Sequence, residues 1–380
     1  MNVLHVIPSL AEKSGGPSQA IIPMCLALQE KGIDVSLVST DEGFSGPLAA
    51  NFFDYKGVKT RLFPVNWGSS FKYSKELRAW LESNVSTFDI VHIHAVFNHA
   101  CVAAARACQM KRVPYVLRPL GSLDSWSMKQ KKLKKQLFWQ LAAKKMVQNA
   151  AVVHYTSVAE QHDSESYLEL NRGAVVPLGV DVPVQVDPMP DENNPYVLVI
   201  SRLVPTKNIH VLLESFIELS RKEEFAKWRL IIGGAGDEGY VRELEARVVS
   251  GQVETKVLFK GWVSGADKFS LLRSASLFAL PSQHENFGVS VVEAMACKVP
   301  VVVSPEVAVS AQIQAWDAGW ISSAETLTNV LAAAMSNHAE RQRRGEAAFE
   351  LAKEFSWSNV AEKISTLYEQ ITVPRVLQPA

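Results

Sequence analysis

The chain has 380 residues, of which 39 are basic, 39 are acidic and 47% are hydrophobic. This length and hydrophobic content predict two domains, each with its own core. The balanced charge gives no support to a nucleic-acid partner, which would favour a strongly basic chain.

In the first half of the chain, short apolar segments alternate with longer segments of helical periodicity. We predict strands at residues 3–7, 34–38, 58–63, 90–94, 115–117, 151–155 and 174–177. We predict helices at residues 18–31, 75–85, 97–110 and 129–148. Near-continuous apolar strands that alternate with helices are typical of an α/β fold with a doubly wound parallel sheet.

A segment with four prolines at residues 181–195 interrupts this pattern and predicts a linker. The pattern then restarts, with strands predicted at 197–200, 229–232, 257–259, 277–280 and 301–303. We therefore expect a first domain at 1–183, a linker at 184–195 and a second domain at 196–358. Two successive units of this kind suggest two Rossmann-like domains that face a central cleft.

Two carboxylates lie eight residues apart in the second domain. Glu285 follows a turn-like segment, and Glu293 lies among Val, Ala and Met residues of a helix-like run. Eight helical residues rise about 12 Å, roughly the reach from the ribose to the hexose of a nucleotide sugar, and sugar hydroxyls would be suitable partners for such acids. The alternative is that Glu285 is a helix-start acid and Glu293 an ordinary residue of an amphipathic face.

Loops that follow strands carry candidate phosphate and nucleotide contacts. Arg202 and Lys207 follow the strand at 197–200, where ligands bind parallel sheets and where the two cations could neutralise a diphosphate. Solvated loop cations are the alternative. Other candidate contacts are the glycines near the first helix and after two further strands, namely Gly16 in Ser14-Gly15-Gly16-Pro17, Gly234 in Gly233-Gly234-Ala235-Gly236, and Gly261 with Trp262 and Val263.

The first domain offers histidines at the end of a predicted strand, in His92-Ile93-His94, and His99 further on. We expect the rings of His92 and His94 to point to opposite faces of the sheet, so that they do not share a metal ion. His94 is then a candidate for a hydrogen bond to a sugar, with a buried structural role as the alternative. Arg118 ends the next predicted strand and points to the same region.

Several absences limit the function class. The chain has no Asp-x-Asp, no Gly-x-Ser-x-Gly, no P-loop motif and no zinc-type spacing, so we expect no metal and no cofactor. The four cysteines form no Cys-x-x-Cys pair, and we expect buried free thiols in a reducing compartment. No signal peptide is evident at the start of the sequence, and no segment is long enough to span a membrane. We expect a cytoplasmic protein.

A basic amphipathic run extends from Lys129 to Lys135, next to Leu137, Phe138 and Trp139. Such a run could dock on an anionic membrane, which would place the protein peripherally on the inner face. The alternative is a solvated helix face.

Together these motifs resemble the retaining, nucleotide-sugar glycosyltransferases of family 4, which have the GT-B fold. The resemblance covers nearly the whole chain, and its most specific part is the segment at 281–300, which looks like the family's Glu-x7-Glu signature. Supporting matches lie at 201–208, 233–236, 259–263, 155–157 and 178–181. The family also implies that a last helix, at 359–371, crosses back to the first domain. The apolar stripe of Val360, Ile364, Leu367 and Ile371 agrees with this.

The resemblance implies roles for the candidate residues. Glu293 would bind the ribose, and Glu285 the transferred sugar with Asn286, Phe287 and Gly288. Arg202, Lys207 and Gly16 would hold the diphosphate. Gly234, Gly261, Trp262 and Val263 would contact the nucleotide. His94 would face the reacting sugar, while Arg118 and His99 are candidates for the acceptor side.

Two positions depart from the family pattern. Lys298 stands where relatives usually have glycine, which puts the left-handed backbone geometry there in doubt, and residues 304–308 lack the usual glycine-rich turn.

We therefore expect transfer of a hexose, with glucose from UDP-glucose as the best guess, to a saccharide or lipid-linked saccharide in cell-envelope or extracellular polysaccharide synthesis. The family's usual proposal is a front-face substitution without metal. The alternatives are a GT-B nucleotide-sugar epimerase, or a non-catalytic GT-B-like protein that binds sugar nucleotides.

Overall fold

The computed structural model describes residues 1–11, 16–44, 51–68, 71–130, 132–169, 173–183 and 190–372, without the side chain of Pro17. The chain forms two compact units. Unit 1 comprises Met1–Gly179 together with Trp357–Ala380, and unit 2 comprises Val180–Ser356. Ser14, Gly15, Lys131 and residues 184–189 of the proline-rich linker lie outside the described residues.

Unit 1 contains an eight-stranded sheet in the order β3-β4-β2-β1-β5-β6-β7-β8. Its strands are β1 (Asn2–Ser9), β2 (Asp34–Thr40), β3 (Phe53–Tyr55), β4 (Val58–Phe63), β5 (Ile90–His94), β6 (Tyr115–Arg118), β7 (Val152–Tyr155) and β8 (Gly173–Val175). All neighbouring strands are parallel except the edge strand β3, which is antiparallel to β4. The central parallel strands β1, β5 and β6 are buried on both faces, which explains why they read as near-continuous apolar runs.

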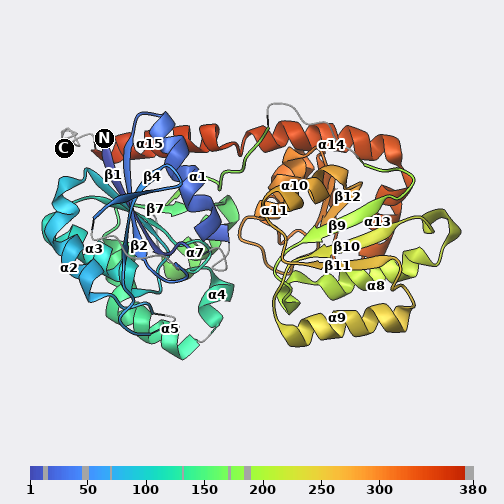
Figure 1. The fold of residues 1–380 in the computed structure, drawn as a ribbon, viewed down its shortest axis with the longest axis horizontal. Helices are drawn as coiled ribbons and strands as arrows, with labels where there is room; N and C mark the ends of the chain where they lie inside the picture. The colour runs from blue at the N-terminus through green and yellow to red at the C-terminus, as the bar shows by residue number, and fades with distance from the viewer. Residues whose placement is uncertain are drawn as a thin grey trace. The chain divides into compact units, whose positions relative to one another are not determined.

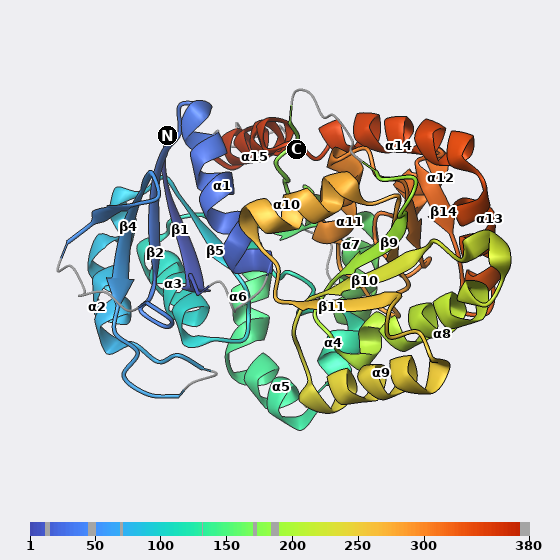
Figure 2. The same cartoon turned by 45° about the vertical axis from the view of Figure 1, so that its right-hand side comes forward.

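Two apolar layers cover the sheet of unit 1. The helices are α1 (Gly16–Glu30), α2 (Lys75–Asn84), α3 (His99–Lys111), α4 (Ser125–Lys129), α5 (Lys132–Phe138), the π-helix η3 (Trp139–Ala143), α6 (Lys144–Gln148), α7 (Val158–Leu168) and α15 (Trp357–Thr372). One core contains residues of α1 and α15, and the other contains residues of α2 and α3. Figures 1 and 2 both show α15 alongside α1, so the end of the chain completes the unit that its beginning starts.

Unit 2 contains a six-stranded parallel sheet in the order β11-β10-β9-β12-β13-β14. Its strands are β9 (Tyr196–Ile200), β10 (Arg229–Gly233), β11 (Val257–Gly261), β12 (Leu277–Leu280), β13 (Val301–Val303) and β14 (Gly319–Ile321). Its helices are α8 (Ile209–Ser220), α9 (Glu238–Gly251), α10 (Gly265–Ser274), α11 (Val289–Ala296), α12 (Ser310–Ala315), α13 (Leu327–Ser336) and α14 (His338–Lys353). In Figure 1, α8 and α9 lie on one side of this sheet, and α10 and α11 on the other. The doubly wound prediction is confirmed in both units.

The structure corrects the predicted helix at 129–148. This stretch contains α5, then a π-helix over Trp139–Ala143, then α6, while α4 already ends at Lys129. A periodic sequence did not reveal this insertion, because a π-helical turn adds one residue without changing which residues are apolar. The strands β3 and β14 were also not predicted. Asp54 interrupts β3 and Gly319 begins β14, whereas the equally short β13 is a run of three valines.

Lys298 adopts the left-handed conformation, with a φ of 59°, although it is not glycine. Its Nζ lies 2.9 Å from Oε2 of Glu346, so the side chain has a partner on α14. The doubt about the geometry of this position is thereby resolved. The four cysteines are free and buried, as predicted. Among the described residues, none of the helices has the length and apolar character needed to cross a bilayer.

Candidate functional site

The strand order of unit 2 reverses between β9 and β12. The chain winds from β9 through β10 to β11 on one side, then returns to place β12 against the free edge of β9. In open parallel sheets, the loops at the carboxyl ends of two such strands diverge and leave a crevice where ligands bind. The loop at 201–208 follows β9 and the loop at 281–288 follows β12. They are joined here, because the Gln283 amide donates to the Thr206 carbonyl at 2.9 Å.

Lys207 and Glu285 form an ion pair across this reversal. The Nζ of Lys207 lies 2.5 Å from Oε2 of Glu285 and 3.3 Å from the carbonyl oxygen of His284. Lys207 is 7% exposed, so the pair is largely shielded from water. An ammonium group has three donors, and these two contacts occupy two of them. Among the described residues these are its two oxygen contacts, which leaves a third donor for another oxygen ligand. Arg202, on the same loop, is exposed.

Glu293 lies within α11, the helix that follows the Glu285 loop, and pairs with Lys268 of α10. The distance between Nζ of Lys268 and Oε1 of Glu293 is 2.5 Å, and both side chains are mostly buried. Burial raises the pKa of the Glu293 carboxyl, and the nearby Lys268 acts in the opposite direction. The two acids of the Glu-x7-Glu signature therefore form two separate ion pairs. Glu285 pairs with Lys207, and Glu293 pairs with Lys268.

Glycines allow the loop after β10 to pack directly on the loop after β9. A Cβ atom at Gly234 would overlap the carbonyl oxygen of Ser201, and one at Gly236 would overlap that of Leu203. The Gly234 amide also donates to the Gly261 carbonyl at 2.6 Å, which joins the loop after β11 to the same layer. Trp262 is 49% exposed beside it, and Val263 is half-buried. The predicted nucleotide contacts therefore form one continuous edge of the unit 2 sheet.

The residue at the N-cap position of α11 has no side chain with which to cap the helix. Gly288 occupies the cap position with a φ of 90°, and no side-chain hydrogen bond closes the first turn. The preceding Phe287 is buried and packs edge-on against Phe355 at 5.6 Å between ring centroids, which fixes the start of the helix. A bare helix N-terminus presents free amides and a partial positive charge to an anion or a hydroxyl. Asn286 lies in the same loop.

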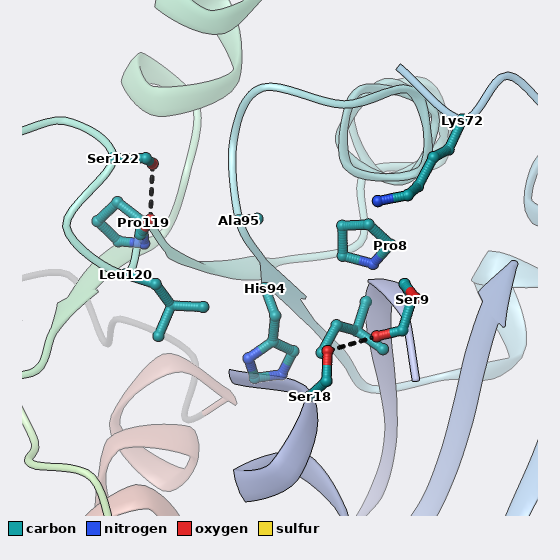
Figure 3. Close-up of a pocket in the computed structure, with 10 residues that line it drawn as sticks. Pro8, Ser9, Ser18, Lys72, His94, Ala95, Pro119, Leu120 and Ser122 are labelled. Atoms are coloured by element: carbon teal, nitrogen blue, oxygen red, sulfur yellow. Dashed lines mark hydrogen bonds between the residues drawn. The ribbon is translucent and has the colours of Figure 1, made fainter. Parts of the chain in front are cut away.

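Unit 1 contains a pocket of about 240 Å³ at its own strand-order reversal, between β1 and β5. Its lining comes from the ends of these strands, from α1, from the segment before α2 and from the loop after β6, and includes Ser9, Ser18, Lys72, His94 and Ser122. Figure 3 shows the ring of His94 between Leu120 and the hydrogen-bonded pair of Ser18 and Ser9. The structure thus places His94 in a pocket that combines apolar side chains with three serines.

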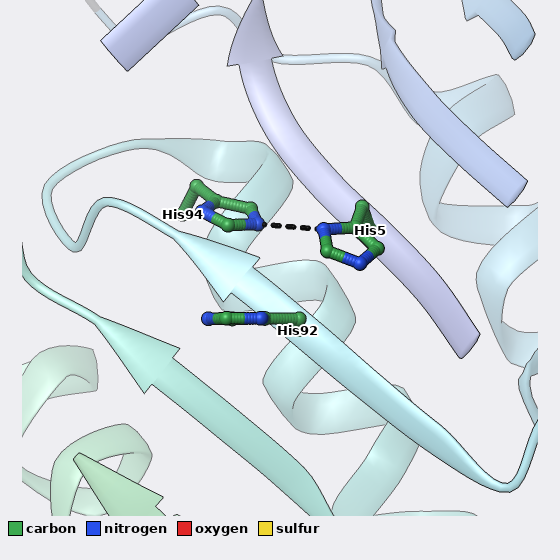
Figure 4. A group of neighbouring side chains, drawn as sticks. All are labelled: His5, His92 and His94. Carbon is green, nitrogen blue, oxygen red and sulfur yellow. Dashed lines mark hydrogen bonds between the residues drawn. The ribbon is translucent and has the colours of Figure 1, made fainter. Parts of the chain in front are cut away.

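The prediction that His92 and His94 point to opposite faces is wrong. Their ring centroids are 4.3 Å apart and nearly parallel, because residues two apart on a strand share a face. His5 of β1 lies in register opposite His92 and joins the group, with its Nδ1 3.0 Å from Nε2 of His94 (Figure 4). The ring nitrogens of these three residues lie within 4.8 Å of one another, which a metal ion would also require.

The other candidate residues of unit 1 are Arg118, His99 and Gly16, and their surroundings differ. Arg118 is 3% exposed, and burial lowers the pKa of its guanidinium to about 10. His99 accepts a hydrogen bond from the Ser74 amide at 3.2 Å through Nδ1, and its ring packs on Tyr73. Gly16 is the first residue of α1 and has open space where a Cβ would be. An acceptor role for Arg118 and His99, and a phosphate contact for Gly16, stay predictions.

The sequence did not identify Lys268, Lys72, His5, His154 or Tyr368 as part of these sites. Lys268 and Lys72 are single cations on otherwise ordinary segments, so no pattern distinguishes them. His5 and His154 did carry a signal, because each interrupts a strand that is apolar on both sides. Four histidines in the central strands of one sheet are unusual enough to suggest a shared polar cluster.

Comparison with known proteins identifies the family. Residues 186–351 match the model of the glycosyl transferases group 1, and residues 15–179 match the model of the glycosyl transferase 4-like domain. The chain belongs to the group 1 glycosyltransferases. It is similar to a phosphatidyl-myo-inositol mannosyltransferase of Mycobacterium leprae, with 32% identity over 44% of each chain. The chain spans between 25% and 44% of the first three curated relatives that it matches.

Solved structures show the fold. HepE of Anabaena, in complex with UDP and glucose, has a TM-score of 0.75 and 20% identity over 97% of this chain and 100% of its own. Sucrose-phosphate synthase of Thermosynechococcus elongatus has a TM-score of 0.75 and 16% identity over 97% and 98%. The predicted GT-B fold is therefore confirmed.

The buried histidines predict a loss of stability in acid. Burial lowers the pKa of His5 to about 3 and places those of His92, His94 and His154 well below the usual 6.5. The unfolded chain therefore binds more protons below pH 6.5, so the stability that is complete above this pH falls as the pH drops toward 3. Each histidine contributes at most about 1.4 kcal/mol per pH unit.

Unfolding followed between pH 8 and pH 5 should show uptake of about four protons by these histidines below pH 6.5. The variant His154→Leu should lower that uptake by one, whatever its own effect on the free energy of unfolding. A melting temperature that stays flat from pH 7 to pH 5.5 would contradict the prediction.

Proposed function

We propose that this protein is a retaining hexosyltransferase that uses a UDP-sugar, with UDP-glucose as the best donor. The observation that carries the proposal is the arrangement of the two signature acids in unit 2, each with a separate lysine, beside a bare helix N-terminus. Relatives named as mannosyltransferases and a fold neighbour solved with UDP and glucose support sugar transfer. The acceptor we propose is a saccharide or a lipid-linked saccharide of a cell-envelope or extracellular polysaccharide.

The chemistry follows from the charges in unit 2. Arg202, the third donor of Lys207 and the amides at the start of α11 would stabilise the negative charge on the departing diphosphate. Glu285 would hold the transferred sugar through its hydroxyls, and the ion pair with Lys207 would orient its carboxylate. Glu293 would accept from the ribose. The leaving phosphate would take the proton of the acceptor hydroxyl, so that the new bond forms on the face from which the diphosphate leaves. No metal is proposed in this step.

Incubation with UDP-hexoses and a polysaccharide or lipid-linked acceptor should release free UDP and give a product with the anomeric configuration of the donor. Glu285→Gln keeps the size of the side chain but removes its charge, and it should lower kcat at least tenfold. Epimerised UDP-sugar without net loss of sugar would instead indicate an epimerase. Binding of UDP-sugars without any turnover, with every acceptor tried, would indicate a non-catalytic protein.

Arg202→Ala should weaken UDP binding in calorimetry by about tenfold or more, since a hydrogen bond to a charged group is worth roughly 1.5–3 kcal/mol. Because Arg202 is exposed, the melting temperature should not change. Lys207→Ala should weaken binding and also lower stability, because it leaves Glu285 half-buried without its partner. The matched control is Lys227→Ala, an exposed lysine between α8 and β10. Unchanged UDP affinity in both site variants would exclude a diphosphate role for this loop.

We further propose that unit 1 contacts an anionic membrane through α5 and the π-helix. Leu133, Leu137 and Leu141 are 83%, 63% and 74% exposed and lie four residues apart. Lys132 and Lys134 are exposed beside them. Lys135 is not part of this basic face, because its Nζ donates to the Ser127 carbonyl at 2.7 Å. Exposed apolar side chains flanked by lysines fit an interfacial helix.

Sedimentation with vesicles should separate the two contributions. Lys132→Gln/Lys134→Gln should reduce binding to anionic vesicles, since each lysine near the surface contributes about 1 kcal/mol, and 0.5 M salt should have the same effect. Leu133→Ser/Leu137→Ser/Leu141→Ser should reduce binding at every salt concentration. Val249→Ser, at an exposed apolar residue of unit 2, is the control. Equal recovery with neutral and anionic vesicles would favour the solvated-face interpretation.

A further inference from the structure

A buried polar stripe crosses the α1/α15 face of the unit 1 sheet, beside the buried Arg118 of β6. It contains His5 of β1, His92 and His94 of β5, His154 of β7 and the hydroxyl of Tyr368 of α15, all at most 1% exposed. The strand neighbours of these histidines belong to the core on the opposite face, for example Leu4, Ile93 and Val153. The proposed chemistry in unit 2 uses none of this stripe, yet one of its ends is the pocket residue His94.

The stripe is a continuous chain of hydrogen bonds. It runs from His94 Nε2 to His5 Nδ1 at 3.0 Å, and from His5 Nε2 to the Tyr368 hydroxyl at 3.4 Å. The hydroxyl then lies 2.6 Å from Nδ1 of His92. His92 Nε2 lies 3.2 Å from Nδ1 of His154, whose Nε2 lies 2.8 Å from the Val176 carbonyl oxygen.

The carbonyl at one end sets the direction of every bond. A carbonyl oxygen can only accept, so His154 must carry its proton on Nε2. A neutral imidazole has one donor and one acceptor, so Nδ1 of His154 accepts from Nε2 of His92. By the same rule, Nδ1 of His92 accepts from the Tyr368 hydroxyl, whose oxygen accepts from Nε2 of His5. Nδ1 of His5 then accepts from Nε2 of His94.

These bond directions require that all four histidine rings are neutral. All four are buried, and burial is the largest cause that lowers the pKa of each. The charged groups that face the stripe are Arg118 of β6 and, further from it, Glu160 of α7, which acts on Arg118. The Arg118 cation disfavours a second positive charge on any ring.

We propose that this chain of hydrogen bonds fixes His94 as the Nε2-protonated tautomer, so that its Nδ1 is a permanent acceptor for a hydroxyl group of a sugar in the unit 1 pocket. Within the described part of the chain, Nδ1 of His94 has no hydrogen-bond partner. The volume of the pocket and the polar side chains in its lining, namely Ser9, Ser18, Lys72 and Ser122, suit a sugar hydroxyl. His5, His92, His154 and Tyr368 are then positioning residues, which act through His94. The identity of the ligand rests on the proposed function, but the tautomer does not.

A shared metal ion is the competing explanation for His5, His92 and His94. It would require three lone pairs that converge on one point. In the stripe, however, both nitrogens of His5 and of His92 already have hydrogen-bond partners, and the Arg118 cation lies close by. The proposal therefore commits to the hydrogen-bond chain, and metal content becomes an outcome of the test.

The experiment is nitrogen NMR of the full chain, labelled with ¹⁵N at histidine and without any sugar bound, since the two neutral tautomers give distinct pairs of nitrogen shifts. The His94 signal is assigned by its loss in His94→Gln. We expect His94 with protonated Nε2 and unprotonated Nδ1 at every pH from 6 to 8. In Tyr368→Phe, His5 loses the acceptor for its Nε2 proton, and a second His94 tautomer should appear.

Tyr155→Phe is the matched control. Tyr155 is also fully buried in unit 1, but no hydrogen bond of its hydroxyl is described. This variant should leave the His94 tautomer unchanged. With UDP-sugar turnover as a second readout, Tyr368→Phe should raise KM for the sugar substrate that occupies the pocket at least threefold, while the affinity for free UDP stays the same.

Three results would overturn the proposal: wild-type His94 protonated at Nδ1, a Tyr368→Phe variant that leaves His94 wholly in the Nε2 form, or a stoichiometric metal ion held by the three histidines in the purified protein. An absence of UDP-sugar turnover alongside the expected tautomers would instead count against the proposed function alone.

Discussion

The reversal of strand order between β9 and β12 is the constraint on which the unit 2 site depends. It separates two loops that would otherwise cross the sheet edge in the same direction, and the Lys207–Glu285 pair spans the gap. The glycines after β10 then let a third loop lie directly on the first. Unit 1 has the same topology between β1 and β5, and its pocket forms at the corresponding place. Position in the sheet, rather than any single motif, brings these side chains together.

Charge burial is balanced differently in the two units. Unit 2 buries each acid next to a lysine, which avoids the high free-energy cost of an unpaired buried ion. The charged groups of these pairs could then contact a ligand in place of each other. Unit 1 buries histidines that stay neutral and satisfy one another through hydrogen bonds, with the single cation of Arg118 nearby. The first arrangement suits an anionic diphosphate, and the second suits a hydroxyl group.

The sequence predicted most strands closely. Strands buried on both faces form distinct apolar runs, and β5, β12 and β13 match their predicted ranges at both ends. The more polar β4 also matches its range. It also identified Glu285 and Glu293 but not their partners. Lys268 comes from a different helix, and only the packing of α10 on α11 brings it near. The faces of His92 and His94 were misjudged by a wrong use of strand periodicity, not by a lack of information. The π-helix could not be predicted, since its extra residue leaves no mark on the apolar pattern.

The position of α15 has a consequence for folding during synthesis. Unit 1 is translated first, but Tyr368 and the apolar residues of α15 that cover its sheet come last. At typical rates of translation, making the intervening unit takes on the order of ten to thirty seconds. For that time the nascent first unit has an uncovered apolar face and an unfinished histidine stripe. Unit 2 is contiguous, so its whole sequence is available to form a core before the last helix of unit 1 has been made.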